Sequence, residues 1–149
     1  MTPAELESYL HEHIPISRAM QVAVIELTPD TVVLSAPLAP NINHRETVFG
    51  GSASAVAILA AWSLLHTRLA SAGLSGRLVI QRNTMSYDLP IAGAFSARAS
   101  IDDPLAWDSF TRTLERKGRA RVNVNSILEH DGRIAARFEG AFVALRAES

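Results

Sequence analysis

The sequence predicts an α+β fold in which one antiparallel sheet wraps around a long central helix. An uncharged, alanine-rich segment begins at Gly50-Gly51 and runs toward Gly73, and segments with apolar residues at every second position lie on both sides of it. A surface helix shows a polar stripe, so a helix that is apolar on every face is expected to be enclosed by protein. The segments with a period of two are expected to be the strands that enclose it.

The segment before the central helix predicts one short helix and a hairpin. A helix is expected over residues 3–13, because Thr2 can cap it, Pro3 suits the first helical position and leucines recur at helical spacing. Pro15 is expected to end this helix. Residues 20–27 and 31–38 are rich in Val, Ile and Leu on either side of a Thr-Pro-Asp turn, which predicts two antiparallel strands.

Four strands and a second short helix are expected after the central helix. Residues 77–87 and 94–101 are strand candidates, the latter with strict alternation of apolar and polar side chains. An Asp-Pro start and a glycine stop delimit a helix over residues 103–118. Two further strands, around residues 120–125 and 134–139, flank an Asp-Gly hairpin turn, and Ile134, Ala136 and Phe138 are expected on one apolar face of the second. Two strands, a long buried helix and four more strands are the order of the hotdog fold.

Composition excludes several classes of function. The chain of 149 residues is expected to form a single domain, residues 1–149, without cysteines and therefore without disulfides or thiolate nucleophiles. The formal net charge of −1 lacks the basic footprint of a nucleic-acid-binding protein. No signal-peptide pattern opens the sequence, and the many small residues of the uncharged segment argue against a membrane span. A cytoplasmic protein without nucleic-acid or membrane partners is expected.

Several motifs resemble the thioesterase family known as the C-terminal domain of YiiD-type proteins. They are Pro-Asn-Ile-Asn-His at residues 40–44 and Thr-Val-Phe-Gly-Gly-Ser at residues 47–52. Trp62, residues 87–91 and residues 118–121 extend the resemblance along nearly the whole chain. The resemblance implies a hotdog fold and action on acyl thioesters of coenzyme A or acyl carrier protein. Coenzyme A would then enter as part of the substrate, with no separate cofactor.

Better-characterised hotdog acyl-CoA thioesterases begin the central helix with His-Gly-Gly, place an Asn at a fixed distance before that His, and carry an Asp or Glu further along the helix. This sequence reads Phe-Gly-Gly there, with Asn43 six residues before the Phe. The resemblance therefore carries over Asn43, Gly50 and Gly51 as candidate catalytic residues. It does not carry over the acid, because Ile58 occupies that position and no Asp or Glu occurs over residues 47–87.

Gly50 and Gly51 are expected to act through their backbone. Unpaired N–H groups at a helix N-terminus point at a site where negative charge can develop on a thioester oxygen under attack. The alternative is that the glycines only permit a tight turn into the helix.

The group that activates water has several candidates. Asn43 could orient water or bond the substrate, and His44 could act as general base. Asp88, reaching a neighbouring protomer's helix start, or Glu46 could replace the missing helix carboxylate. Each of these residues could also be an ordinary loop or surface residue.

Five further residues are candidates for substrate binding. Arg119 belongs to the densest basic cluster, which could hold the phosphates of coenzyme A or simply be the solvated side of a strand. Ser52 could serve as a hydroxyl partner or as a helix cap. The candidates are Phe49, Ser52, Ser86, Tyr87 and Arg119. The histidines show no metal-ligand spacing, so no metal site is expected.

Three functions stay open at this point. The first is thioester hydrolysis by water attack, and the second is acyl-thioester binding without hydrolysis, which the missing helix carboxylate favours. The third, dehydration of 3-hydroxyacyl thioesters, needs a His and an acid poised over the substrate, and the helix offers no acid. A small wrapped sheet also leaves an open edge and an uncovered apolar region, so a homodimer or homotetramer is expected.

Overall fold

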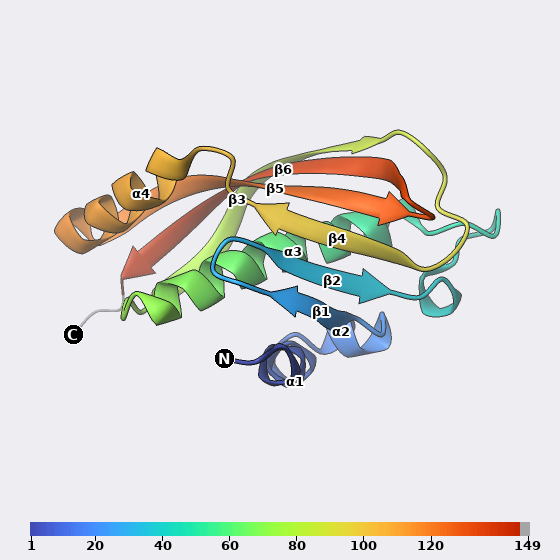
Figure 1. Ribbon diagram of the computed structural model, residues 1–149, viewed down its shortest axis with the longest axis horizontal. Coiled ribbons are helices and arrows are strands. Elements are labelled where there is room, and N and C mark those ends of the chain that lie inside the picture. The colour runs from blue at the N-terminus through green and yellow to red at the C-terminus, as the bar shows by residue number, and fades with distance from the viewer. Residues whose placement is uncertain (147–149) are drawn as a thin grey trace.

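The computed structural model describes residues 1–146, within which six strands form one antiparallel sheet in the order β1-β2-β4-β5-β6-β3 (Figure 1). The long helix α3 lies against the concave side of this sheet. The elements are α1 (Pro3–His13), α2 (Pro15–Ala19), β1 (Ala23–Leu27), β2 (Val32–Ala36), the 3-10 turn η1 (Ala39–Asn41), α3 (Gly50–Ser71), β3 (Gly76–Tyr87), β4 (Phe95–Ser100), α4 (Pro104–Lys117), β5 (Arg119–His130) and β6 (Arg133–Arg146).

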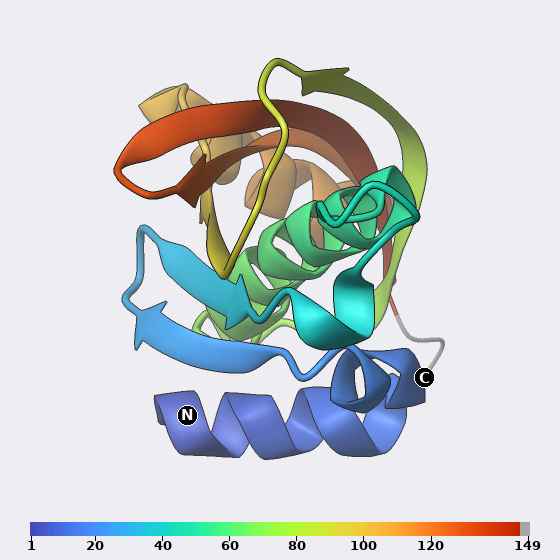
Figure 2. The same cartoon turned by 90° about the vertical axis from the view of Figure 1, so that its right-hand side faces the viewer.

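Helix α3 is enclosed from two sides, which explains why its sequence lacks a polar stripe. Figure 2 looks roughly along α3 and shows the sheet arching over it, with α1 on the opposite side. Ser126 on β5 fixes the helix to the sheet by donating a hydrogen bond of 2.9 Å to the carbonyl of Ala57. Tyr9 on α1 stacks on Trp62 at 6.2 Å between ring centres. By length and composition α3 could also cross a membrane, but 56% of its most apolar stretch of 18 residues is buried inside this fold.

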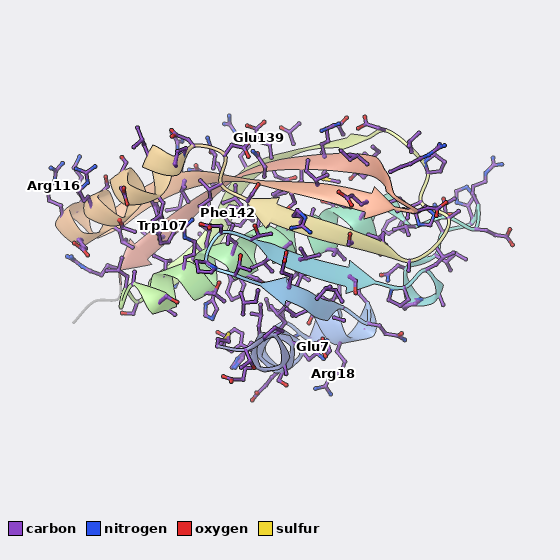
Figure 3. The ribbon with its side chains drawn as sticks, in the orientation of Figure 1. Glu7, Arg18, Trp107, Arg116, Glu139 and Phe142 are labelled. Atoms are coloured by element: carbon purple, nitrogen blue, oxygen red, sulfur yellow. The ribbon has the colours of Figure 1, made fainter. Side chains whose placement is uncertain are left out.

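The inner faces of the strands supply the rest of the core. Phe95, Ala97 and Ala99 on β4 are all buried, as their alternation predicts. Phe142 on β6, between Val122 on β5 and Ile80 on β3, is completely buried (Figure 3). Leu114 on α4 is 1% exposed and closes the core where β4 has already ended.

Sequence signals at helix ends are confirmed in the structure. The hydroxyl of Thr2 caps α1 by accepting a hydrogen bond of 3.1 Å from the N–H of Glu5. Asp103 caps α4 through the N–H of Leu105 at 2.9 Å. Gly118 ends α4 with a φ of 74°, a left-handed conformation that costs glycine little.

Pro15 does more than the sequence indicated. It follows the end of α1, as expected, but then occupies the start of the short helix α2, where a fixed φ suits the first helical turn. The first strand consequently begins at Ala23, later than residue 20 where the apolar pattern begins.

A β-bulge changes the expected pattern at the start of β6. Alternation predicted Ile134 and Ala136 on the same buried face, but Ile134 is 40% exposed while Ala135 and Ala136 are both buried. The pairing of β5 with β6 shifts register at this point, which places an extra residue in β6. The carbonyl of Ala135 accepts hydrogen bonds from the N–H groups of Asp88 and Leu89. The bulge therefore anchors the chain that leaves β3.

Candidate functional site

The start of α3 is held in place by a buried asparagine. Asn41 is 2% exposed, and its side-chain amide donates to the carbonyls of Met20 at 3.0 Å and Pro37 at 2.8 Å. The backbone carbonyl of Asn41 accepts a hydrogen bond of 2.8 Å from the N–H of Phe49, the residue that precedes Gly50 and the helix. Sequence reasoning missed this role, because an asparagine that is buried in a loop has no local signal that separates it from an exposed one.

The first N–H groups of α3 are left without partners. The N–H groups of Ser52 and Ala53 both donate to the carbonyl of Phe49, at 2.9 and 3.1 Å. Within residues 1–146, those of Gly50 and Gly51 meet no acceptor. The partial positive charge of a helix N-terminus adds to these two donors. The helix start can therefore stabilise a negative oxygen.

The end of β3 faces this helix start. The hydroxyl of Tyr87 lies 3.4 Å from the carbonyl of Gly50, and a β-carbon on Gly50 would lie 3.5 Å from the Tyr87 ring. A pocket of about 310 Å³ lies between them, lined mostly by apolar side chains. Its lining is formed by Val48, Gly50, Ala53, Tyr87, Asp88, Leu89, Pro90, Ile91 and Ala136. Of the residues predicted from the sequence, the structure thus brings Gly50, Tyr87 and Asp88 together in one pocket.

Asp88 is the acidic residue of this pocket, and its carboxylate already has two neighbours. The hydroxyl of Ser86 donates to Oδ1 at 2.8 Å, and Nε of Arg137 lies 3.7 Å from Oδ2. These contacts orient the carboxylate, which is 45% exposed and open to water. In this structure, the hydroxyl of Ser86, a predicted substrate-binding residue, is therefore used to orient the Asp88 carboxylate.

Asn43 and His44 lie in the loop before α3 and do not line the pocket. The side-chain oxygen of Asn43 accepts from the N–H groups of Arg45 at 2.8 Å and Thr47 at 3.1 Å, and its amide donates to the Thr47 hydroxyl at 3.0 Å. Asn43 thus fixes the shape of its own loop. His44 and Glu46 are both exposed.

Phe49, Gly51 and Ser52 form the rim of the helix start. Phe49 occupies the N-cap position without a side-chain cap and is 58% exposed. Ser52 is therefore not the cap of α3. A β-carbon on Gly51 would lie 2.3 Å from Cε2 of Phe49, so this ring covers the glycine closely.

Arg119 lies at the opposite end of the sheet in the same chain. It pairs with Leu145 on β6, whereas Tyr87 pairs with Ala136. Nine residues of strand separate these two positions, which corresponds to about 30 Å. Within one chain, Arg119 and the start of α3 therefore lie near opposite ends of β6.

This chain is similar in sequence and structure to proteins described as thioesterases. A family model described as "Putative thioesterase (yiiD_Cterm)" matches residues 3–146. A protein of unknown function from Chlorobaculum tepidum has a TM-score of 0.92 at 27% identity, over 97% of this chain and 94% of its own. A "putative thioesterase" from Shewanella oneidensis has a TM-score of 0.85 at 29% identity, over 96% of each chain.

A structure from Pseudomonas aeruginosa, described as a "Probable Thioesterase", supports the fold alone, with 22% identity and a TM-score of 0.83 over 98% of this chain and 97% of that one. The antiparallel sheet, the enclosed helix and these similar structures establish a hotdog fold. The chain belongs to the family described as "Putative thioesterase (yiiD_Cterm)".

Proposed function

We propose that this protein hydrolyses acyl thioesters of coenzyme A or acyl carrier protein by direct attack of water. The observation that carries the proposal is the pair of N–H groups of Gly50 and Gly51, which have no acceptor within residues 1–146, at a helix start where Gly50 lines a mainly apolar pocket. In the reaction, the thioester oxygen takes up negative charge and accepts hydrogen bonds from these groups. The carbon–sulfur bond then breaks, the thiol leaves, and the carboxylic acid remains.

The pocket suits the part of an acyl group that is next to the thioester. Val48, Ile91 and Ala136 give it apolar walls, and the Tyr87 ring closes one side. Apolar lining with few polar groups is typical of sites that bind the hydrocarbon part of a ligand.

Asp88 is the candidate base favoured by position, because it lines the pocket and its carboxylate is held by Ser86 and Arg137. A base must come within hydrogen-bond reach of the attacking water, directly or through one further water. His44 is the second candidate, on the exposed loop that precedes the helix. In this proposal Asn43 contributes by holding that loop.

A second copy of the chain completes the proposed site. Strand β3 is an edge of the sheet and carries exposed apolar side chains, with Val79 43% and Tyr87 56% exposed. Phe49 and Leu89, next to the pocket, are 58% and 44% exposed. An unpaired strand with apolar neighbours is a surface that another strand can cover.

Antiparallel pairing of two β3 strands about a twofold axis would place the start of one strand beside the end of the other. Arg77 at the start of β3 shares its row of the sheet with Arg119, since both pair with Leu145. The dimer proposed here therefore brings the Arg119 end of one protomer toward the Gly50 end of its partner. There a guanidinium group could bind a phosphate of coenzyme A.

Binding without hydrolysis is the alternative, and the absence of any Asp or Glu in α3 favours it. Purified protein should be tested with a panel of acyl-CoA and acyl carrier protein thioesters, with thiol release and binding heats measured on the same samples. Hydrolysis predicts thiol release above the buffer rate for at least one substrate. Binding heats without thiol release would select the alternative.

A further inference from the structure

A second cleft lies at the other end of α3, about 660 Å³ in volume. Arg68, in its wall, is eighteen residues along the helix from Gly50, or about 27 Å. The core between the two ends is filled by completely buried side chains, among them Ala57, Ala60 and Leu64. The cleft is therefore separate from the candidate site described above.

One side of the cleft combines a cation with an aromatic ring. The guanidinium carbon of Arg68 lies 4.3 Å from the centre of the Trp107 ring. Trp107 comes from the side of α4 that faces α3 (Figure 3). Such stacking fixes the plane of a guanidinium group and leaves its N–H donors free at the edge. Among residues 1–146, neither of the two ion pairs includes Arg68, and no hydrogen bond uses its side chain.

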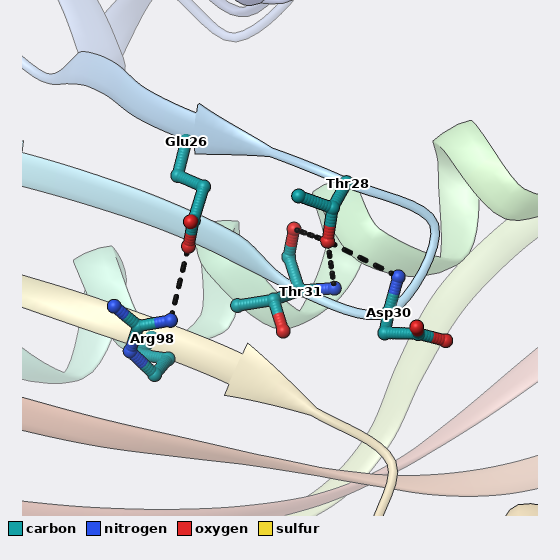
Figure 4. A network of polar contacts seen from close by, with 5 residues as sticks. All are labelled: Glu26, Thr28, Asp30, Thr31 and Arg98. Atoms are coloured by element: carbon teal, nitrogen blue, oxygen red, sulfur yellow. Dashed lines mark hydrogen bonds and ion pairs between the residues drawn. The ribbon is translucent and has the colours of Figure 1, made fainter.

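Another part of the lining is the turn between β1 and β2, which is held by hydrogen bonds within the turn. Figure 4 shows the hydroxyl of Thr28 accepting hydrogen bonds from the N–H groups of Asp30 at 3.3 Å and Thr31 at 3.0 Å. The same hydroxyl donates to the carbonyl of Thr31 at 3.3 Å. The turn therefore presents Leu27 and Pro29 to the cleft as a preformed apolar surface.

We propose that this cleft binds an apolar monocarboxylic acid, with the carboxylate on Arg68 and the hydrocarbon part between Trp107 and the Leu27–Pro29 turn. A guanidinium group presents two parallel N–H donors that match the two oxygens of a carboxylate. The volume lies in the range of small-molecule sites, and most of the lining is apolar with a few polar groups. The single negative charge of a carboxylate matches the single positive charge of Arg68, the arginine of this lining.

His66 also lines the cleft, but it does not add positive charge near neutral pH. Burial, and secondarily the neighbouring His13, lowers the pKa of His66. Arg68 therefore supplies the positive side chain that faces a bound anion. Binding of the acid does not depend on the proposed hydrolysis. If hydrolysis occurs, however, its product has the chemistry that this cleft fits, and product would occupy a site remote from the reaction.

Octanoate is a suitable probe, because Trp107 lines the cleft and its fluorescence should change when octanoate binds. The chain has two tryptophans, so the Trp62→Phe variant leaves Trp107 as the single tryptophan, whose emission can be excited selectively over that of tyrosine. Titration with sodium octanoate at pH 7.5 should change the Trp107 emission in a saturable way, and octanol should bind at least about tenfold more weakly. Calorimetry on the wild-type chain checks that the change at Trp62 leaves affinity intact.

Two variants locate the site. Arg68→Gln should weaken octanoate binding by about tenfold or more, while Arg112→Gln, on the exposed surface of α4, should leave it unchanged. Ala70→Phe keeps the arginine but fills the cleft, and should abolish binding. If Arg68→Gln proves unfolded by circular dichroism, the Ala70→Phe result decides.

Equal affinity for octanol and octanoate, an Arg68→Gln variant that is folded and binds like wild type, or no saturable response in the wild type would each overturn the proposal. Thiol release measured on the same variants separates it from the proposed function. Both cleft variants should keep wild-type initial rates with acyl-CoA, because Arg68 and Ala70 lie about 27 and 30 Å along the helix from Gly50.

Discussion

The hydroxyl of Tyr87 donates a hydrogen bond of 3.4 Å to the carbonyl of Gly50, which joins the end of β3 to the first residue of α3. The Tyr87 ring lies beside the helix start and lines the same pocket as Gly50. An edge strand and the proposed oxyanion site are therefore in direct contact. A change at Tyr87 should therefore affect mainly the binding of the substrate.

Replacing Tyr87 tests which part of the side chain matters. Tyr87→Ala removes the aromatic wall and should raise KM for acyl-CoA about tenfold, with a smaller effect on kcat. Tyr87→Phe removes only a long, exposed hydrogen bond and should stay within about threefold of wild type in kcat/KM. Steady-state kinetics by thiol release check both variants. Equal losses in the two variants would assign the role to the hydroxyl.

Asp88 and His44 can be ranked as bases by their variants. Asp88→Asn keeps the size of the side chain but removes the basic oxygen, and should lower kcat by about a hundredfold or more. His44→Ala should cost less than about tenfold if the residue is only an exposed loop position. Ser86→Ala, which frees Oδ1 of Asp88 from its neighbour, serves as a control for local geometry.

The reverse ranking, with His44→Ala inactive and Asp88→Asn active, would place the base on the loop. The pH–rate profile of Asp88→Asn would then match that of wild type. Full activity in both variants would remove both residues from the mechanism.

Element types were predictable from the sequence where local chemistry decides them. Thr2 and Asp103 cap helices with their own side chains, and Gly118 ends α4 in a conformation that suits glycine. The lack of a polar stripe correctly indicated that α3 is enclosed. These signals depend on residues close in sequence, or on one property of a whole helix.

Features set by contacts between distant segments were not predictable. The bulge at Ala135 depends on the chain leaving β3, whose N–H groups its carbonyl accepts. Asn41 holds the loop before α3 because its side-chain amide donates to the carbonyls of Met20 and Pro37, and Met20 is distant in the sequence. Likewise, only the strand register shows that Arg119 and Tyr87 lie nine residues apart along β6, about 30 Å of strand in the same chain.

Acidification should destabilise the protein through His66. Its ring stacks on Tyr9 at 4.8 Å and Trp62 at 4.7 Å, and burial, then His13, lowers its pKa from the ordinary 6.5. The unfolded chain therefore binds this proton more readily, so the stabilisation is complete above about pH 6.5 and is lost as the pH falls below it.

Urea unfolding at pH 7.5 and 5.5 checks this direction. The free energy of unfolding of wild type should be lower at pH 5.5 than at pH 7.5. His66→Phe should make this difference smaller. His44→Phe, at an exposed position, should not. An unchanged pH dependence in His66→Phe would contradict the assignment.

Assembly should depend on the β3 edge. Wild-type protein is expected to sediment as a dimer or larger at micromolar concentration, and Val79→Lys should shift it toward monomer by placing a charge on the proposed interface. Ile25→Lys is the matched control, since Ile25 is 61% exposed on the other edge strand, β1. A monomeric wild type that retains thiol release would contradict the shared site.

Thiol release by wild type and by Gly51→Val, with acyl-CoA at saturating concentration, tests the central claim most directly. A β-carbon at this position would press on the Phe49 ring and crowd the N–H groups. The double variant Phe49→Ala with Gly51→Val relieves the contact with the ring while keeping the crowding. The account predicts release above background for wild type and a loss of about a hundredfold or more in both folded variants. A wild type that binds acyl-CoA without releasing thiol, or a folded Gly51→Val with wild-type turnover, would contradict it.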